Sequence, residues 1–288
     1  MKIWQVVAAL SALAFLFTRS RGPKPQLVIT SWREKYLPPN WATKAKAAGF
    51  HAVSQKIADG TSAFQSAEAA NVFKTADAAG LRRQGWGWHN LRTPAEAQAE
   101  AVNAASLARD FGVDVYWVNA EKVWAGTEDQ PKTPNPPREM LTFVKTFRAN
   151  APGVELAFNG YSGEKTSDGR PLATREVLQA FDYFAPMNYG TKASTVANKY
   201  RTRSARAKAA GVKYAPMFGT GRVDNKGNVW GFALGPNGLI ALNEEDRADI
   251  MAFWYGPGSE QMLEFGSTAN PPLTQLAQVL HGKQPAIA

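Results

Sequence analysis

Apolar runs and alanine-rich stretches alternate along most of the chain. Each apolar run of strand length is followed by a loop, a stretch with helical spacing and then a glycine. The pattern Ala-Ala-Gly followed by an apolar residue occurs at 47–50, 78–81 and 209–212. A glycine directly after a helix adopts the left-handed conformation that ends the helix, and the apolar run after it begins a strand. The alternation therefore predicts parallel strands joined by crossover helices.

Eight such strands are predicted, and one of the helices between them is clear at 94–111, with Pro94 at its start and Arg109 in its last turn. The predicted strands are 27–32, 52–57, 81–88, 113–118, 154–159, 183–188, 213–218 and 250–254. Eight strand–helix repeats predict an α/β fold in which residues 27–288 form a single (β/α)8 barrel, the TIM barrel. The alternative, an open doubly wound sheet, usually has fewer strands.

The first twenty residues have a different character from the rest of the chain. No charged residue occurs from Ile3 to Thr18, while Lys2 precedes this run and three basic residues follow it by position 24. The run is short for a relaxed membrane span of about 20 residues, yet long enough for a signal-peptide core. We predict a hydrophobic membrane anchor or signal-like segment at 1–20 and a stiff linker at 21–26. This implies a membrane-anchored or exported protein of the cell envelope; an ordinary buried helix is the alternative.

Composition narrows the chemistry that is available. The chain has no cysteine and three scattered histidines, so disulfides, thiolate sites and a histidine-rich metal centre are not expected, and no metal or organic cofactor is implied. The net charge of +9 suggests an anionic environment such as a cell wall. The densest basic run, 199–208, has helical spacing and is interpreted as a solvated helix face. No nucleic-acid-binding motif accompanies it, so no nucleic acid partner is expected.

The fourth predicted strand ends in the most informative residues. Side chains alternate along a strand, so Trp117, Asn119 and Glu121 share one face. If that face points into the barrel, Glu121 lies at the rim, where barrels of this kind carry their active sites. Aromatic neighbours such as Trp117 and Trp124 would favour the protonated form that a general acid for glycoside cleavage needs. The alternative is a surface glutamate paired with Lys122.

Two short motifs resemble family 18 glycoside hydrolases, the chitinases and endo-N-acetylglucosaminidases. Asp114-x-x-Trp117-x-Asn119-x-Glu121 resembles their D-x-x-D-x-D-x-E on strand four, and the sequence at 187–190 resembles their M-x-Y-D on strand six. Trp254 falls where they carry a tryptophan under the sugar. The departures are that Trp117, Asn119 and the glycine at position 190 stand in place of aspartates. The resemblance implies that Glu121 is the general acid, that Asn119 and Tyr189 orient the N-acetyl group, and that Trp254 stacks on the sugar.

A second resemblance, to family 25 lysozymes, runs from about residue 53 to Glu121. The segment 55–61 (Gln-Lys-Ile-Ala-Asp-Gly-Thr) is similar to their lysine-containing strand ending in E-G-T, and Trp88-His89 is similar to a later Y-H. Both families cleave next to N-acetylated hexosamines, so they imply the same substrate class. If the substrate does not supply the nucleophile, Asp59 after strand two, or Glu34 after strand one, is the carboxylate best placed to do so.

Aromatic and amide side chains at the strand ends form the predicted substrate-binding set. Sugar rings stack on aromatic faces, and their hydroxyl and amide groups bind to carboxamides. The predicted set is Trp254, Trp86, Trp88, Trp124, Asn159, Asn188 and Gln55. We therefore expect a hydrolase of an N-acetylhexosamine polysaccharide such as peptidoglycan, and the apolar N-terminus also resembles phage lysis or virion-associated proteins. The alternative is a catalytically silent barrel that binds glycan or serves as a scaffold.

Overall fold

A computed structural model describes residues 25–37, 39–119, 136–160, 173–190, 192–219, 222–223, 229–230, 241–243 and 245–255. The predicted N-terminal segment, and most of the predicted linker after it, lie outside these residues. Within the described part of the chain, no helix has both the length and the apolar character needed to cross a membrane.

Parallel strands form a closed ring. The hydrogen-bonded order is β8-β7-β6-β5-β4-β2-β1-β12-β9, and all of these pairings are parallel. The strands are β1 (Gln26–Ser31), β2 (Ala52–Asp59), β4 (Arg82–Trp88), β5 (Val115–Asn119), β6 (Glu155–Asn159), β7 (Tyr183–Phe184), β8 (Lys213–Tyr214), β9 (Met217–Gly219) and β12 (Ile250–Tyr255). Because β8 and β9 are consecutive pieces of one stretch, which pairs with β7 on one side and β12 on the other, the ring closes. Each predicted strand segment overlaps an observed strand, which confirms the barrel.

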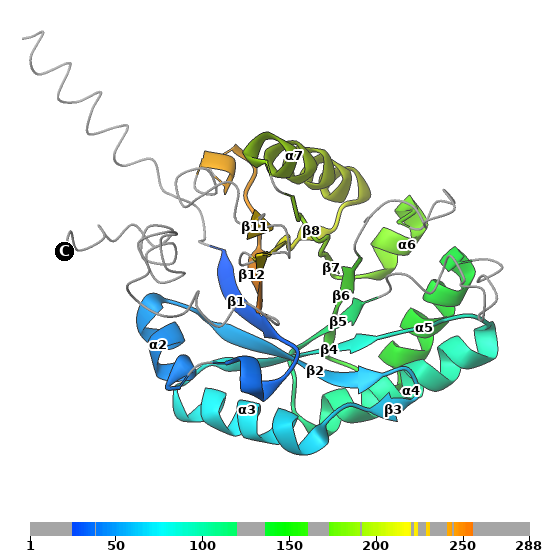
Figure 1. The fold of residues 1–288 in the computed structure, drawn as a ribbon. Coiled ribbons are helices and arrows are strands. Elements are labelled where there is room, and N and C mark those ends of the chain that lie inside the picture. The colour runs from blue at the N-terminus through cyan, green and yellow to red at the C-terminus, as the bar shows by residue number, and fades with distance from the viewer. Residues whose placement is uncertain are drawn as a thin grey trace, which may run out of the picture.

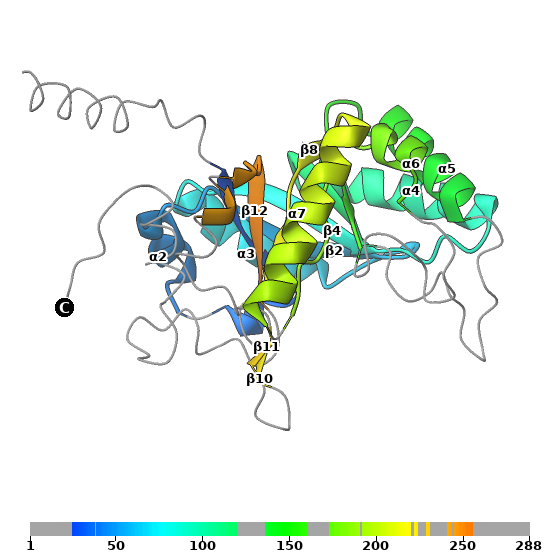
Figure 2. The same cartoon turned by 90° about the horizontal axis from the view of Figure 1, so that it is seen from above.

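Helices follow one another around the outside of this ring (Figure 1). They are α2 (Trp41–Ala48), α3 (Ser66–Ala78), α4 (Pro94–Asp110), α5 (Pro136–Asn150), α6 (Arg175–Ala180) and α7 (Ala193–Ala210). Shorter elements are the 3-10 helix η1 (Glu34–Tyr36), the strand β3 (Ser62–Ala63), which pairs with β2, and the hairpin of β10 (Arg222–Val223) and β11 (Val229–Trp230). This hairpin lies near the start of α7 (Figure 2).

The helix ends form as the sequence predicts. α2 and α7 end on Gly49 and Gly211, whose φ angles of 97° and 73° are left-handed. α4 begins after Thr93, whose hydroxyl accepts a hydrogen bond from the backbone N–H of Glu96, and Pro94 occupies the first turn.

Side-chain alternation along the strands divides the core into two clusters. The outer cluster, between the strands and the helices, contains residues such as Leu27 and Ile29 of β1. The interior cluster fills the barrel itself and contains the intervening Val28 together with Ala52 and Ala252 of the neighbouring strands. A residue's cluster therefore shows whether its side chain points into the barrel.

Candidate functional site

β5 directs Asn119 into the barrel. Val115 and Trp117 belong to the interior cluster, while Tyr116 and Val118 belong to the outer one. Alternation therefore places Asn119 on the inner face, at the carboxyl end of the strand, and its exposed fraction is 4%. The sequence predicts that Trp117 and Asn119 share a face, and the place of Trp117 in the interior cluster shows that this face is the inner one. Glu121 and Trp124, the predicted acid and one predicted sugar contact, lie outside the described residues.

Aromatic side chains from separate strands meet inside the barrel near Asn119. Trp86 is buried, and its ring centroid lies 5.3 Å from that of Trp254, which is partly exposed. The Trp86 indole N–H donates to the carbonyl oxygen of Ser31 at 2.8 Å, which fixes its orientation. Tyr189 packs against the same interior cluster, with its hydroxyl 3.4 Å from the sulfur of Met217. Three predicted site residues, from β4, β12 and the segment after β7, thus pack in or against one cluster.

Trp117 occupies the layer of side chains below Asn119. It is 1% exposed, and its indole N–H donates to the side-chain oxygen of Gln84 at 2.8 Å. An indole that is buried and hydrogen-bonded in this way fills the barrel core. The position where the family 18 motif has an aspartate is therefore used here for packing.

Asp59 and Asn159 stand on either side of β4 and β5. Asn159 is buried at the end of β6, beside Asn119 in the ladder, and its amide donates to the carbonyl oxygen of Ala185 at 2.7 Å. Asp59 ends β2, and its side chain is 48% exposed. Its carboxylate accepts a hydrogen bond from the ammonium of Lys56 at 2.8 Å. Lys56 had no predicted role, although a charged residue in the middle of a buried strand is the signal that could have drawn attention to it.

Three predicted sugar contacts are placed elsewhere. Gln55 is fully buried and donates to the carbonyl oxygen of Trp32 at 3.0 Å. Asn188 is also fully buried and donates to the hydroxyl of Tyr214, a residue of the outer cluster. Both amides are enclosed by the protein in this structure, and their roles as sugar contacts stay predictions. Trp88 is partly exposed and packs against the outer cluster, not the interior one.

A buried polar network joins the ends of β4 and β5 to α4. His89 lies 3.1 Å from the carboxylate of Glu100 through Nδ1 and 2.9 Å from the hydroxyl of Tyr116 through Nε2. Burial, followed by the charge of Glu100, raises the pKa of the Tyr116 hydroxyl well above its ordinary value, so the hydroxyl stays protonated. The backbone N–H of His89 also donates to the carbonyl oxygen of Asn119 at 3.0 Å. His89 is itself fully buried, so its role in this structure is to hold the backbone at the end of β5 through this hydrogen bond.

Two residues of the basic run on α7 form hydrogen bonds with the chain segment after β7. Arg203, only 4% exposed, donates to the carbonyl oxygen of Met187 at 2.8 Å and to the side chain of Asn188 at 2.9 Å. Lys199 donates to the carbonyl oxygen of Tyr189 at 2.8 Å, and burial together with the nearby Arg203 lowers its pKa. The interpretation of this run as a solvated face is wrong for Arg203. These contacts hold the chain segment that carries Tyr189.

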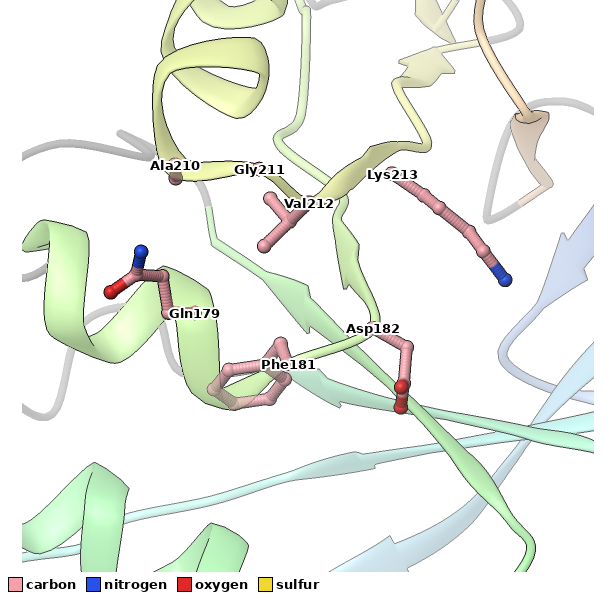
Figure 3. Close-up of a pocket in the computed structure, with 7 residues that line it drawn as sticks. All are labelled: Gln179, Phe181, Asp182, Ala210, Gly211, Val212 and Lys213. Carbon is pink, nitrogen blue, oxygen red and sulfur yellow. The ribbon is translucent and has the colours of Figure 1, made fainter.

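An open groove among the described residues lies at the opposite end of the barrel. It has a volume of about 450 Å³ and lies where β7 and β8 begin (Figure 3). Gln179 and Phe181 line one side, while Lys213 extends away from them and pairs with Glu155 at 2.9 Å. The amino ends of barrel strands stabilise the fold and do not carry chemistry. Within the described residues, no group of three or more histidines and carboxylates could hold a metal ion.

The fold is shared with solved glycoside hydrolases. It matches a family 18 chitinase from Pseudoalteromonas aurantia with a TM-score of 0.57 and 12% identity, over 80% of this chain and 94% of that one. A family 18 chitinase from Cycas revoluta matches with a TM-score of 0.57 and 13% identity, over 89% and 100% of the two chains. The spore cortex-lytic enzyme SleL of Bacillus megaterium matches with a TM-score of 0.61 and 8% identity, over 92% and 75%.

Searches of known protein families and of curated proteins find no match for this chain. At identities this low, the structural likeness shows the fold alone, and the chemistry has to be argued from the residues of this chain. The chain has the (β/α)8 barrel architecture found in glycoside hydrolases that act on N-acetylhexosamine glycans.

Proposed function

We propose that this protein is a glycoside hydrolase that cleaves a polysaccharide containing N-acetylhexosamine, with peptidoglycan as the first substrate to test. The observation that carries the proposal is that Trp86 and Trp254 meet inside the barrel and that Tyr189 packs against the same interior cluster, while Asn119 ends β5 on the inner face. Aromatic faces beside a carboxamide are what a pyranose with an N-acetyl group requires. The shared fold with chitinases and a cortex-lytic enzyme supports the same substrate class.

The proposed mechanism assigns one step to each of these groups. Glu121, two residues after Asn119 in the sequence, protonates the leaving oxygen and then activates water as a base. Asn119 and Tyr189 orient the N-acetyl group, and Trp254 stacks under the sugar ring. Asp59 is the available second carboxylate, and the positive charge that develops at the sugar carbon is stabilised by a carboxylate nearby.

The test compares the wild-type protein with Glu121→Gln by the release of reducing ends from purified peptidoglycan and from chitin oligomers. Removal of a general acid lowers the rate by about 10²-fold or more. Glu176→Gln, an exposed glutamate in the first turn of α6, is the matched control and keeps wild-type activity. Equal activity of the Glu121→Gln variant and the wild type would remove Glu121 from the mechanism.

A second candidate function is a catalytically silent barrel that binds glycan. The observation that favours it is the burial of Trp117, which fills the interior where the family 18 motif has an acid. Folded wild-type protein that binds peptidoglycan but releases no reducing ends would establish this alternative.

The cellular setting is also a proposal. The apolar run from Ile3 to Thr18 and the net charge of +9 support a membrane-anchored or exported protein held against an anionic envelope, with a phage lytic or virion-associated role as one setting. Fractionation of cells that express the full chain or a chain starting at Gln26 tests this. Recovery of both forms in the soluble cytoplasmic fraction would contradict it.

A further inference from the structure

An extra residue in β2 changes the direction of Asp59. Lys56 pairs with Trp86 in the ladder between β2 and β4, whereas Ala58 pairs with the very next residue of β4, and Asp59 then pairs with Trp88. In a regular strand, residues three apart point to opposite faces. The bulge brings Lys56 and Asp59 to the same side, because the two residues between them, Ile57 and Ala58, both lie in the outer cluster. Bulges that redirect a side chain in this way occur preferentially beside active sites.

Lys56 is the buried member of the pair. Its side chain is only 5% exposed, and its ammonium lies 4.1 Å from the ring centroid of Phe64 and 5.4 Å from that of Trp86. Aromatic faces attract a cation, but a buried ammonium still requires an anion. Asp59 supplies that anion at 2.8 Å. The ammonium is therefore fixed on three sides, next to the tryptophan that contacts Trp254 in the interior cluster.

Asp59 is the accessible member. Its side chain is 48% exposed, at the carboxyl end of β2, which is the end of the barrel at which Asn119 also lies. The backbone after it is fixed as well, because the N–H of Gly60 donates to the carbonyl oxygen of Trp88 at 2.7 Å and its carbonyl accepts from the side chain of Asn103 at 3.1 Å. The carboxylate can thus meet a ligand while the lysine that holds it cannot.

We propose that Lys56 is a positioning residue, which holds Asp59 in place as the ionised carboxylate facing the sugar carbon where the glycosidic bond breaks. This rests on the proposed hydrolase function. The transition state of glycoside cleavage carries positive charge at that carbon, and a fixed carboxylate stabilises it more than a mobile one. Lys56 touches no substrate and acts through Asp59.

The experiment measures kcat and KM of the full-length protein on peptidoglycan for the variants Lys56→Met, Lys56→Arg, Asp59→Asn and the double variant Lys56→Met/Asp59→Asn. Lys46→Met is the matched control, because Lys46 is an exposed lysine on α2. Thermal melting is recorded for every variant. Methionine retains the length of the lysine side chain and removes a buried charge, so Lys56→Met is expected to melt no lower than the wild type.

The expected result is that Lys56→Met lowers kcat by about 10- to 100-fold with little change in KM, because the affected interaction forms in the transition state. Lys56→Arg recovers part of the loss by restoring the cation. The double variant is no slower than Asp59→Asn alone, since Lys56 acts only through Asp59. A merely structural lysine would instead show its effect in the melting temperature.

Two results overturn the inference and leave the hydrolase standing. One is a Lys56→Met variant with wild-type kcat in an enzyme that Glu121→Gln inactivates. The other is a double variant whose loss is the product of the two single losses. A wild-type protein that releases no reducing ends overturns the proposed function, and the role of Lys56 with it.

Discussion

Gly87→Ala tests the buried network that supports Asn119 from behind. A Cβ added at Gly87 would lie 2.8 Å from Nε2 of His89 and 2.9 Å from Cβ of Ala58, and it would overlap the hydroxyl of Tyr116. These side chains are packed within the fold, and Gly87 itself lies inside β4, so relief requires movement of a strand or of the network. The contact between Tyr116 and His89 therefore exists only because position 87 has no side chain.

The expected loss of unfolding free energy in Gly87→Ala has two causes. Insertion of a methyl group into a packed core costs about 1–3 kcal/mol, and loss of a buried hydrogen bond such as that between Tyr116 and His89 costs about 1–3 kcal/mol more. The sum is about 4 kcal/mol. For a domain of this size, about 3 °C of melting temperature corresponds to 1 kcal/mol, so Gly87→Ala is expected to melt about 12 °C below the wild type.

The assay is thermal unfolding followed by circular dichroism, with urea unfolding as the second measurement. Gly211→Ala is the control: its Cβ meets no atom within 4 Å, so it reports only the cost of a left-handed φ, about 1–2 kcal/mol. Tyr116→Phe removes the oxygen that the new methyl group would overlap. The variant Gly87→Ala/Tyr116→Phe should therefore lose less stability than the two single losses added together. A Gly87→Ala protein that melts no lower than Gly211→Ala would refute the proposed packing of this network.

Further predictions concern other parts of the barrel. Arg203→Met leaves two buried acceptors after β7 unpaired, the carbonyl of Met187 and the side chain of Asn188, and should lower the free energy of unfolding by about 2–4 kcal/mol in urea. Arg201→Met breaks only an exposed ion pair and should leave the free energy of unfolding close to the wild-type value. Equal effects of the two would contradict the burial of Arg203. Burial, followed by a hydrogen bond with Glu155, raises the pKa of Tyr183 from 10.0 to about 12. The unfolded chain loses this proton first, so stability should fall as the pH rises from 10.0 to about 12, and Glu155→Gln should shift the phenolate absorbance titration of Tyr183 to lower pH. Trp117→Phe should lower the unfolding free energy by about 2–4 kcal/mol, and a loss near zero would count against its place in the core.

The barrel could be predicted because its signals are local. Each glycine that follows an alanine-rich helix marks a boundary that needs no distant contact, as at Gly49 and Gly211. Alternation along one strand was likewise enough to place Trp117 and Asn119 on the same inner face. Pattern and spacing therefore gave the strand order around the ring and the end of the barrel at which to look for the site.

The roles of individual polar residues were less predictable. Gln55 lies within β2 and Asn188 follows β7, and the side-chain amide of each donates to a protein group more than twenty residues away in the sequence. Nothing in the sequence around Arg203 distinguishes it from its exposed neighbour Arg201, because the difference lies in what α7 packs against.

By itself, the sequence determined the repeating strand–helix units, their number, and the face that Trp117 and Asn119 share on β5. These features follow from the short-range periodicity of apolar and polar residues along the chain. Only the tertiary structure decided that Lys56 and Asp59 form a pair. Their spacing of three residues would separate them on a regular strand, and the extra residue that joins them is visible only in the register between β2 and β4. The physical reason is that register is a property of two strands, and one strand's sequence does not contain it.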